Sequence, residues 1–270
     1  MSAATGREVA ATVAAVLVRE LVAARKRGMR VLAVTSPLSL VAGLAARRLG
    51  APDLAIAGGF TVLDAVDPVP TLTRGEAAYG LDDACRGPAS DTFVAVARGF
   101  VGVCTTPAQL DARGAANLSR IGGSDDAPAV ALPGSRGLPD NNDMPGPVWY
   151  VLPRHTPRQL VATVDFASGP PPSPGRHRRL LTPLGVFALD PGGWRAVSLH
   201  AGVTAAQVRE ATGFAIACDD APVTPSPSDD ERAALAAVDP HGLHALDLLD
   251  RDEAQALVAA ATAAESGSGA

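Results

Sequence analysis

A glycine-rich segment near the middle of the chain, residues 134–140 (GSRGLPD), has residue types suited to binding an anion. Glycines let backbone N–H groups approach a negatively charged oxygen, and such donors can stabilise an oxyanion that forms during a reaction. The arginine can add a cation for a carboxylate or phosphate, or it can block close approach. The alternative is a surface turn between two strands. The predicted binding residues are Gly134, Ser135, Arg136, Gly137, Leu138 and Asp140.

A group of polar residues lies upstream, around Gly114. Gln109, Asp111 and Asn117 can position a substrate by hydrogen bonding. The same residue types also stabilise turns by binding nearby backbone groups, and the sequence does not separate these two roles.

A basic run, Arg176, His177, Arg178 and Arg179, closes a proline-rich segment over residues 169–179. Such a run can meet phosphates, but a solvated loop is the more common outcome and is the interpretation we favour. We expect His200, in the segment SLHAGVT, to have a structural role.

Composition excludes several other classes of site. The net charge of −5 gives no electrostatic footprint for nucleic acid. The three cysteines are scattered, and the five histidines lack the spacing of a metal site, so we predict neither a disulfide framework nor a bound metal. The apolar run 9–18 is about half as long as a membrane span and has no signal-peptide features, which favours a cytoplasmic protein.

The elements that must position these residues begin with a β-α-β pattern. Residues 7–27 predict a helix, 30–34 a strand and 54–57 another strand. Ser36 is the expected N-cap of the helix between the two strands, and Gly50 its end.

Residues 64–92 are rich in proline and glycine and predict loops, and the apolar stretch 92–104 follows them. Further strands are expected at 129–132, 148–152, 160–166 and 184–189. Thr204 with Gln207, and Ser228 with Glu231, form capping-box signatures for two helices. We predict a three-layer α/β/α domain with a mostly parallel sheet over residues 1–248. Residues 249–270 are expected to form a helix and a flexible tail, the tail being AAESGSGA.

Six segments, in the same order along the chain, resemble motifs of family I CoA-transferase β subunits. The resemblance is strongest to the glutaconate CoA-transferase β-like branch, which includes the β chain of a steroid ring-opening CoA hydrolase. The segments are LGAPDLAIAGGFTVLDA (49–65), TPAQLDARGAANLSRIGG (106–123), AVALPGSRGLPD (129–140), VDFASGP (164–170), SLHAGVTAAQVREATGF (198–214) and DDERAALAAVDPHGL (229–243).

The resemblance implies an α/β subunit pair, as αβ or α2β2, that acts on acyl-CoA thioesters. It implies no cofactor besides the coenzyme A carried by the substrate. In the transferases a glutamate of the β chain attacks the thioester and forms an acyl-glutamyl anhydride. The segments around residues 109, 117 and 134–140 match substrate-binding or CoA-binding positions.

The transferase glutamate lies in a YESG turn, and this chain has Gly59 at that position. Glycine cannot attack a thioester, so we assign no catalytic residue to this chain. Glu76 is the nearest alternative, but its surroundings do not match the motif, and a lone loop glutamate is usually solvated.

Three functions remain open. The chain can be the β subunit of a hydrolase or C–C-cleaving enzyme whose catalytic glutamate belongs to the α partner. It can be part of a true CoA transferase between two carboxylic acids, which the loss at Gly59 disfavours. It can also be a non-catalytic scaffold subunit.

Overall fold

The computed structural model describes four stretches of the chain, residues 6–58, 62–64, 85–86 and 88–267. The chain forms two compact units. The first takes Met1–Thr92 and Ser226–Ala270, and the second takes Phe93–Pro225. In the sequence, the second unit is therefore inserted between the two segments of the first. The single domain over residues 1–248 stays a prediction.

The first unit opens with the predicted helix and β-α-β pattern. The elements are α1 (Gly6–Lys26), β1 (Val31–Val34), α2 (Pro37–Leu49) and β2 (Ala55–Gly58). Ser36 caps α2 by accepting a hydrogen bond from the Ser39 backbone N–H, and Gly50 ends the helix with a φ of 144°. The crossover through α2 makes β1 and β2 parallel, as expected.

A glycine lets α2 lie close against the two strands. A Cβ atom at Gly43 would lie 2.8 Å from the Leu32 side chain on β1 and 3.2 Å from Ile56 on β2. Beyond β2, the short strands β3 (Val62–Asp64) and β4 (Cys85–Arg86) add antiparallel pairs to the edge.

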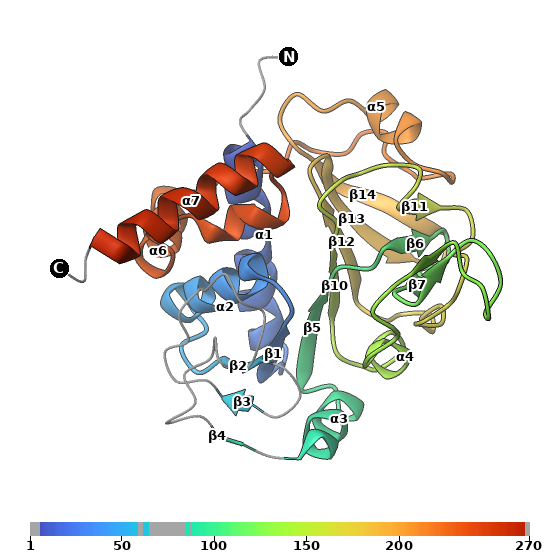
Figure 1. The fold of residues 1–270 in the computed structure, drawn as a ribbon, viewed down its shortest axis with the longest axis horizontal. Coiled ribbons are helices and arrows are strands. Elements are labelled where there is room, and N and C mark those ends of the chain that lie inside the picture. Colours follow the sequence, from blue (N-terminus) through green and yellow to red (C-terminus); the bar gives the residue numbers. More distant parts are fainter. Residues whose placement is uncertain (1–5, 59–61, 65–84, 87, 268–270) are drawn as a thin grey trace. The chain divides into compact units, whose positions relative to one another are not determined.

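The C-terminal segment returns to the N-terminal helices, so the blue and red ends of the ribbon lie side by side in Figure 1. It forms α6 (Asp229–Val238), the 3-10 helix η2 (Leu243–Asp247) and α7 (Arg251–Gly267). Glu231 on α6 pairs with Arg19 on α1, with Nη2 and Oε2 2.6 Å apart. The carboxylate of Asp247 accepts a hydrogen bond from Leu38 N at the start of α2, at 3.0 Å.

The last helix is longer than the sequence indicated. α7 continues to Gly267 and therefore covers most of the segment AAESGSGA, which we expected to form a tail. Alanine is the strongest helix former, and it makes up much of this helix.

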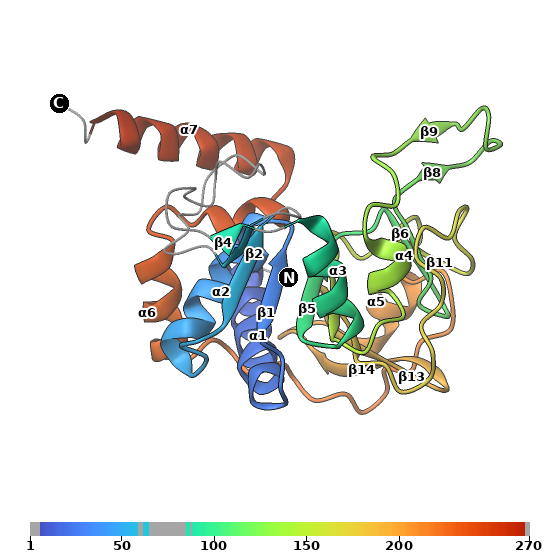
Figure 2. The ribbon, with the colours of Figure 1, turned by 90° about the horizontal axis from the view of Figure 1, so that it is seen from below.

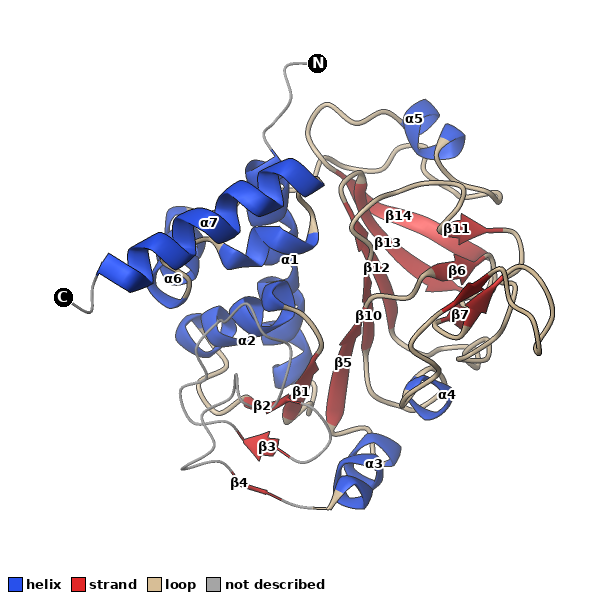
Figure 3. Ribbon diagram, in the orientation of Figure 1, coloured by secondary structure: helices blue, strands red, loops and turns tan. Residues whose placement is uncertain are grey.

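The second unit contains a sheet with strand order β14-β13-β12-β10-β5. The helix α3 (Ala89–Ala97) leads into this sheet. The strands are β5 (Val101–Thr105), β10 (Val148–Val151), β12 (Arg178–Thr182), β13 (Gly185–Asp190) and β14 (Gly193–Leu199). β10 runs parallel to both β5 and β12, whereas β13 and β14 are antiparallel. Figure 3 shows how strands dominate this unit.

Smaller elements carry most of the motif residues. β6 (Gln109–Asp111), β7 (Ala116–Asn117) and β11 (Leu160–Val161) form one small sheet. β8 (Arg120–Ile121) and β9 (Val130–Ala131) form a hairpin that extends away from the rest of the unit in Figure 2. Two short helices, α4 (Leu138–Asn141) and α5 (Ala205–Glu210), complete the unit.

The structure assigns elements that the sequence left open and shortens one that it predicted. The apolar stretch 92–104 is split between α3 and β5, because Gly99 turns the chain with a φ of 76°. The strand expected over 160–166 is only β11, since the Asp165 N–H donates to the side chain of Gln109 instead of to a neighbouring strand. β12 and β14 were not anticipated. β12 begins with two arginines, a start that is untypical of a buried strand.

The prediction of an α/β fold with a parallel sheet is confirmed, with antiparallel strands added at the sheet edges. Both capping boxes are present as predicted, at Thr204 and Ser228. Within the described ranges, no helix combines the length and apolar character needed to span a bilayer.

The pair between Arg19 and Glu231 generates a stability prediction. Glu231 is only 8% exposed and also serves the capping box of α6, so Glu231→Gln removes a charge from both interactions. We expect a loss of about 2 kcal/mol in the free energy of unfolding, measured by urea denaturation. Asp230→Asn, at the exposed neighbouring position, is the control. Equal stability of the two variants would contradict this role for the pair.

Candidate functional site

Gln109 and Asn117 face each other on neighbouring strands, β6 and β7. Asn117 Nδ2 donates to Gln109 Oε1 at 2.8 Å and to the carbonyl of Arg120 at 2.6 Å. Gln109 Oε1 also accepts a hydrogen bond from Asp165 N at 3.0 Å. Both side chains are buried, so these bonds favour the turn-stabilising interpretation. Contact between Gln109 or Asn117 and a substrate stays a prediction.

Ser168 joins a second motif to the first. Its Oγ accepts a hydrogen bond from Leu118 N at 2.8 Å and lies 2.7 Å from Ser119 Oγ. Gly169, the next residue, exchanges two backbone hydrogen bonds with Ala116, of 2.9 and 3.0 Å. We did not single out Ser168 from the sequence, although its position in the motif VDFASGP was a usable signal.

The glycine-rich loop attaches to the same place. Gly134 N donates to the carbonyl of Leu118 at 2.9 Å, and Leu132 N donates to that of Ser119 at 3.0 Å. Gly134 has a φ of 100°, a conformation that favours glycine, and a Cβ there would meet nothing within 4 Å. Three motifs that are separate in the sequence are therefore held together by backbone hydrogen bonds in one unit.

The rest of the loop is partly open to solvent. Arg136 and Asp140 are exposed and Ser135 is half-buried, whereas Gly137 and Leu138 are buried. Exposed positions can meet a ligand, and buried ones fix the loop to the unit. Contact between these residues and a substrate stays a prediction.

Helix α4, which begins within the loop at Leu138, packs directly on the second motif. A Cβ at Gly169 would lie 2.8 Å from Leu138 Cγ and 2.9 Å from Asn142 Cβ, so only glycine fits there. The buried side chain of Asn142 donates to the carbonyls of Gly114 and Pro170 and accepts the hydroxyl of Tyr150 on β10.

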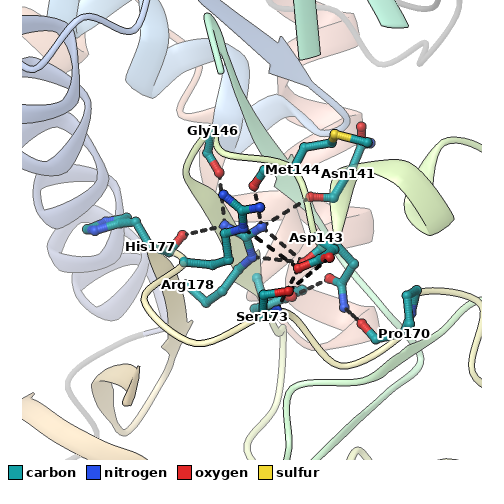
Figure 4. Close-up of polar contacts among 11 residues, drawn as sticks. Asn141, Asp143, Met144, Gly146, Pro170, Ser173, His177 and Arg178 are labelled. Atoms are coloured by element: carbon teal, nitrogen blue, oxygen red, sulfur yellow. Dashed lines mark hydrogen bonds and ion pairs between the residues drawn. The ribbon is translucent and has the colours of Figure 1, made fainter. Parts of the chain in front are cut away.

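Arg178 is the largest departure from the sequence interpretation. Instead of lying in a solvated loop or meeting a phosphate, it is 0% exposed at the start of β12. Its guanidinium donates to the backbone carbonyls that end α4 and lead toward β10 (Figure 4). The accepting residues and distances are Asn142 (3.1 and 3.0 Å), Gly146 (2.9 Å), His177 (2.9 Å), Met144 (2.8 Å) and Asn141 (3.4 Å).

This arrangement explains why an arginine can be buried here. The last carbonyls of a helix lack partners within the helix and attract a cation. Burial lowers the pKa of Arg178, and the carbonyls supply acceptors for its N–H groups. The guanidinium thereby fixes the end of α4, while the glycine-rich loop leads into the start of the same helix.

Asp111 also serves the fold of its motif. Its Oδ1 accepts hydrogen bonds from the backbone N–H groups of Arg113 and Ala115, both at 2.9 Å, across the turn at Gly114. Its Oδ2 is buried without a hydrogen bond within the described residues, and Arg113 Nη2 lies 3.9 Å away. This geometry supports the turn-stabilising role.

The buried histidines are structural. His155 lies between the hydroxyls of Thr182 and Thr212, at 2.9 and 2.8 Å. His200 binds the hydroxyl of Thr224 and the carbonyl of Thr182, both at 3.0 Å, in line with its expected role. Among the described residues, no His, Cys, Asp and Glu side chains cluster in a way that could hold a metal. Gly59 and Glu76 lie outside the described residues.

The Arg178 contacts predict a large effect of substitution. Arg178→Met leaves several buried carbonyls without donors, and we expect a loss of at least about 3 kcal/mol in the free energy of unfolding. Urea denaturation measures it. Arg195→Met, which removes an exposed ion pair with Asp190, is the control and should have a much smaller effect. Similar losses in both variants would contradict the assignment.

The environment of His155 predicts pH-dependent stability. Burial lowers its pKa from 6.5 to about 4, so between these values the unfolded chain binds the proton and the folded one does not. The contribution is complete above the unfolded pKa and is lost as the pH falls toward the folded one. We expect the free energy of unfolding to fall by about 2 kcal/mol between about pH 7 and pH 5. His155→Gln should flatten this slope, and an unchanged slope would count against His155.

No protein-family model matches the sequence. The cholesterol ring-cleaving hydrolase IpdB subunit of Rhodococcus jostii (strain RHA1) is 35% identical over 224 residues, covering 76% of this chain and 83% of that protein. The IpdB subunit of Mycobacterium tuberculosis (strain ATCC 25618 / H37Rv) is 34% identical over 229 residues, covering 77% and 88%.

Several solved structures are similar to this chain over most of its length. The decarboxylase AibA/AibB matches with a TM-score of 0.77 at 31% identity, over 89% of this chain and 98% of that one. Rhodococcus jostii RHA1 IpdAB matches with a TM-score of 0.73 at 29% identity, over 92% and 100%. Glutaconate coenzyme A-transferase from Acidaminococcus fermentans, at 17% identity and a TM-score of 0.71 over 88% and 95%, shares the fold. This chain belongs to the β-subunit branch of the family I CoA-transferases, as the six motifs predicted.

Proposed function

We propose that this chain is the β subunit of a heteromeric enzyme that hydrolyses a carbon–carbon bond in an acyl-CoA thioester. The catalytic glutamate belongs to an α-type partner subunit. Coenzyme A enters only as part of the substrate, with no further cofactor. The complex acts in the cytoplasm, as αβ or α2β2.

One observation carries this proposal: the family motifs are retained while Gly59 stands at the position of the transferase glutamate. The three central motifs are not merely present but bound to one another through Gln109, Ser168 and Gly134. A chain that had lost its function would not need to keep this loop. The relatives support the same conclusion, since IpdB is named as a subunit of a ring-cleaving hydrolase.

The reaction can be divided between the two subunits, with one stabilising an oxyanion and the other transferring protons. Water adds to the ketone of a cyclic β-keto acyl-CoA, and the bond between the ketone carbon and the α-carbon breaks. The ketone becomes a carboxylate, and the α-carbon leaves as a thioester enolate that takes up a proton. The enolate oxygen is an oxyanion, which backbone N–H donors of the loop 134–137 are suited to stabilise. The α subunit supplies the carboxylate that moves the protons.

A second candidate is decarboxylation of an acyl-CoA that carries a free carboxylate. It is favoured by the similarity to the decarboxylase AibA/AibB, at 31% identity over most of both chains. When that carboxylate is attached to the α-carbon, or is conjugated to it through a double bond, its loss as carbon dioxide also leaves a thioester enolate, so the same loop would serve this reaction. The two candidates differ in their product, which either gains water or loses carbon dioxide.

The test is a mass-spectrometric assay of this chain co-expressed with its α-type partner. The complex is incubated with a panel of acyl-CoA thioesters, including cyclic β-keto compounds, in isotopically labelled water with and without acetate. We expect a product that gains one labelled oxygen in a new carboxylate and keeps its thioester. The control is the complex in which the proposed α-chain glutamate is replaced by glutamine, which should be inactive.

Other outcomes separate the alternatives. Transfer of CoA to acetate would show a true transferase and would contradict the proposal. Loss of carbon dioxide would favour the decarboxylase. Tight association of the subunits with no reaction on any thioester would favour the scaffold function.

A further inference from the structure

Arg136 occupies a backbone position that suits glycine. A hydrogen bond from Leu138 N to Ser135 O, of 3.0 Å, closes a four-residue turn with Arg136 and Gly137 at its centre. Arg136 has a φ of 51°, and Gly137 has φ −84° and ψ 4°. A positive φ followed by this pair of angles is the pattern of a type II′ turn, whose first central position is dominated by glycine.

No contact among the described residues explains the strain. Arg136 is exposed, and its side chain makes no hydrogen bond or ion pair with another residue of the described ranges. The only other non-glycine residue with a positive φ in those ranges is Asp220, at 57°. Aspartate tolerates this conformation because its short side chain binds nearby backbone, but arginine has no such local compensation.

A residue that is strained and exposed in a substrate loop is better explained by a partner outside the chain. Strain of this kind collects at ligand-binding positions, where the function of the side chain offsets its cost. The guanidinium presents a planar set of donors that fits the two oxygens of a carboxylate or phosphate. Gly134 N, close by, is anchored on Leu118, so the turn is held to the motif junction and presents Arg136 from a fixed base.

We propose that Arg136 binds an anionic oxygen group of the acyl-CoA substrate, either a carboxylate on the acyl chain or a phosphate of the CoA moiety. The residue thus selects the substrate at the expense of the stability of the loop. This inference rests on the proposed function, because it requires that the complex binds acyl-CoA.

The experiment measures ligand affinity and thermal stability on the same proteins. The complex of this chain with its α-type partner is prepared as wild type, Arg136→Gly, Arg136→Lys and Asp220→Gly. Calorimetry gives Kd for glutaryl-CoA, valeryl-CoA, free CoA and dephospho-CoA. The first pair differs by a terminal carboxylate, and the second by the 3′-phosphate.

We expect Arg136→Gly to raise Tm by about 2 °C, since glycine relieves the strain. The same variant should bind the ligand that carries the recognised anion about 10-fold more weakly. Arg136→Lys keeps the charge and should recover part of that affinity. Asp220→Gly relieves similar strain elsewhere and should leave every Kd unchanged.

The ligand pairs identify the anion. A loss for glutaryl-CoA but not for valeryl-CoA assigns Arg136 to an acyl carboxylate. A loss for free CoA but not for dephospho-CoA assigns it to the 3′-phosphate, and equal losses for all four ligands assign it to the pyrophosphate.

Two results would overturn the inference about Arg136 and leave the proposed function intact. One is wild-type affinity of Arg136→Gly for all four ligands. The other is dissociation of the subunits by Arg136→Gly, measured by size-exclusion chromatography, which would make Arg136 an interface residue. If the wild-type complex binds none of the ligands, the proposed function fails and the inference fails with it.

Discussion

A buried cation whose hydrogen bonds go to backbone carbonyls organises the motif-bearing part of the second unit. Arg178 lies at the start of β12 and donates to the backbone carbonyls that end α4. Those carbonyls have no hydrogen-bond donors within the short helix, and the buried guanidinium has no water molecules to accept its hydrogen bonds. The hydrogen bonds between them therefore satisfy both groups. The glycine-rich loop is thereby fixed at both ends, by Leu118 at its start and by Arg178 beyond α4.

Most of the motif residues act on backbone, and this clarifies their role. Gln109 and Ser168 bind peptide groups of neighbouring motifs, and Asn117 binds the carbonyl of Arg120 within its own motif. Asn142 binds the carbonyls of Gly114 and Pro170. The same holds for the closing motif in the first unit, where Asp239 accepts hydrogen bonds from the backbone of Leu243 and from His244. These residues build a rigid support, and few side chains are left to contact a substrate. Such a division suits a β subunit whose reaction depends on a glutamate from its partner.

The sequence predicted the local elements best where capping and breaking residues stand at both ends. Ser36 and Gly50 delimit α2, and Ser228 starts α6, because capping chemistry depends on a few adjacent residues. β12 was not predicted because an arginine such as Arg178 usually lies in solvent. Its burial depends on backbone acceptors from residues 141–146, which are distant in the sequence. The strain at Arg136 could not be foreseen either, since a backbone angle is a property of the folded turn. The family resemblance located the candidate loop, but the links between its motifs are tertiary contacts.

We propose that this chain supports an acyl-CoA reaction without supplying a covalent nucleophile, since Gly59 stands where the family resemblance places the glutamate of the transferases. The most direct test is the intact mass of this chain, taken from a complex with its α-type partner during turnover of an acyl-CoA. The account predicts an unmodified β chain throughout the reaction. A CoA thioester or an acyl group attached to this chain would contradict it and would identify a nucleophile here.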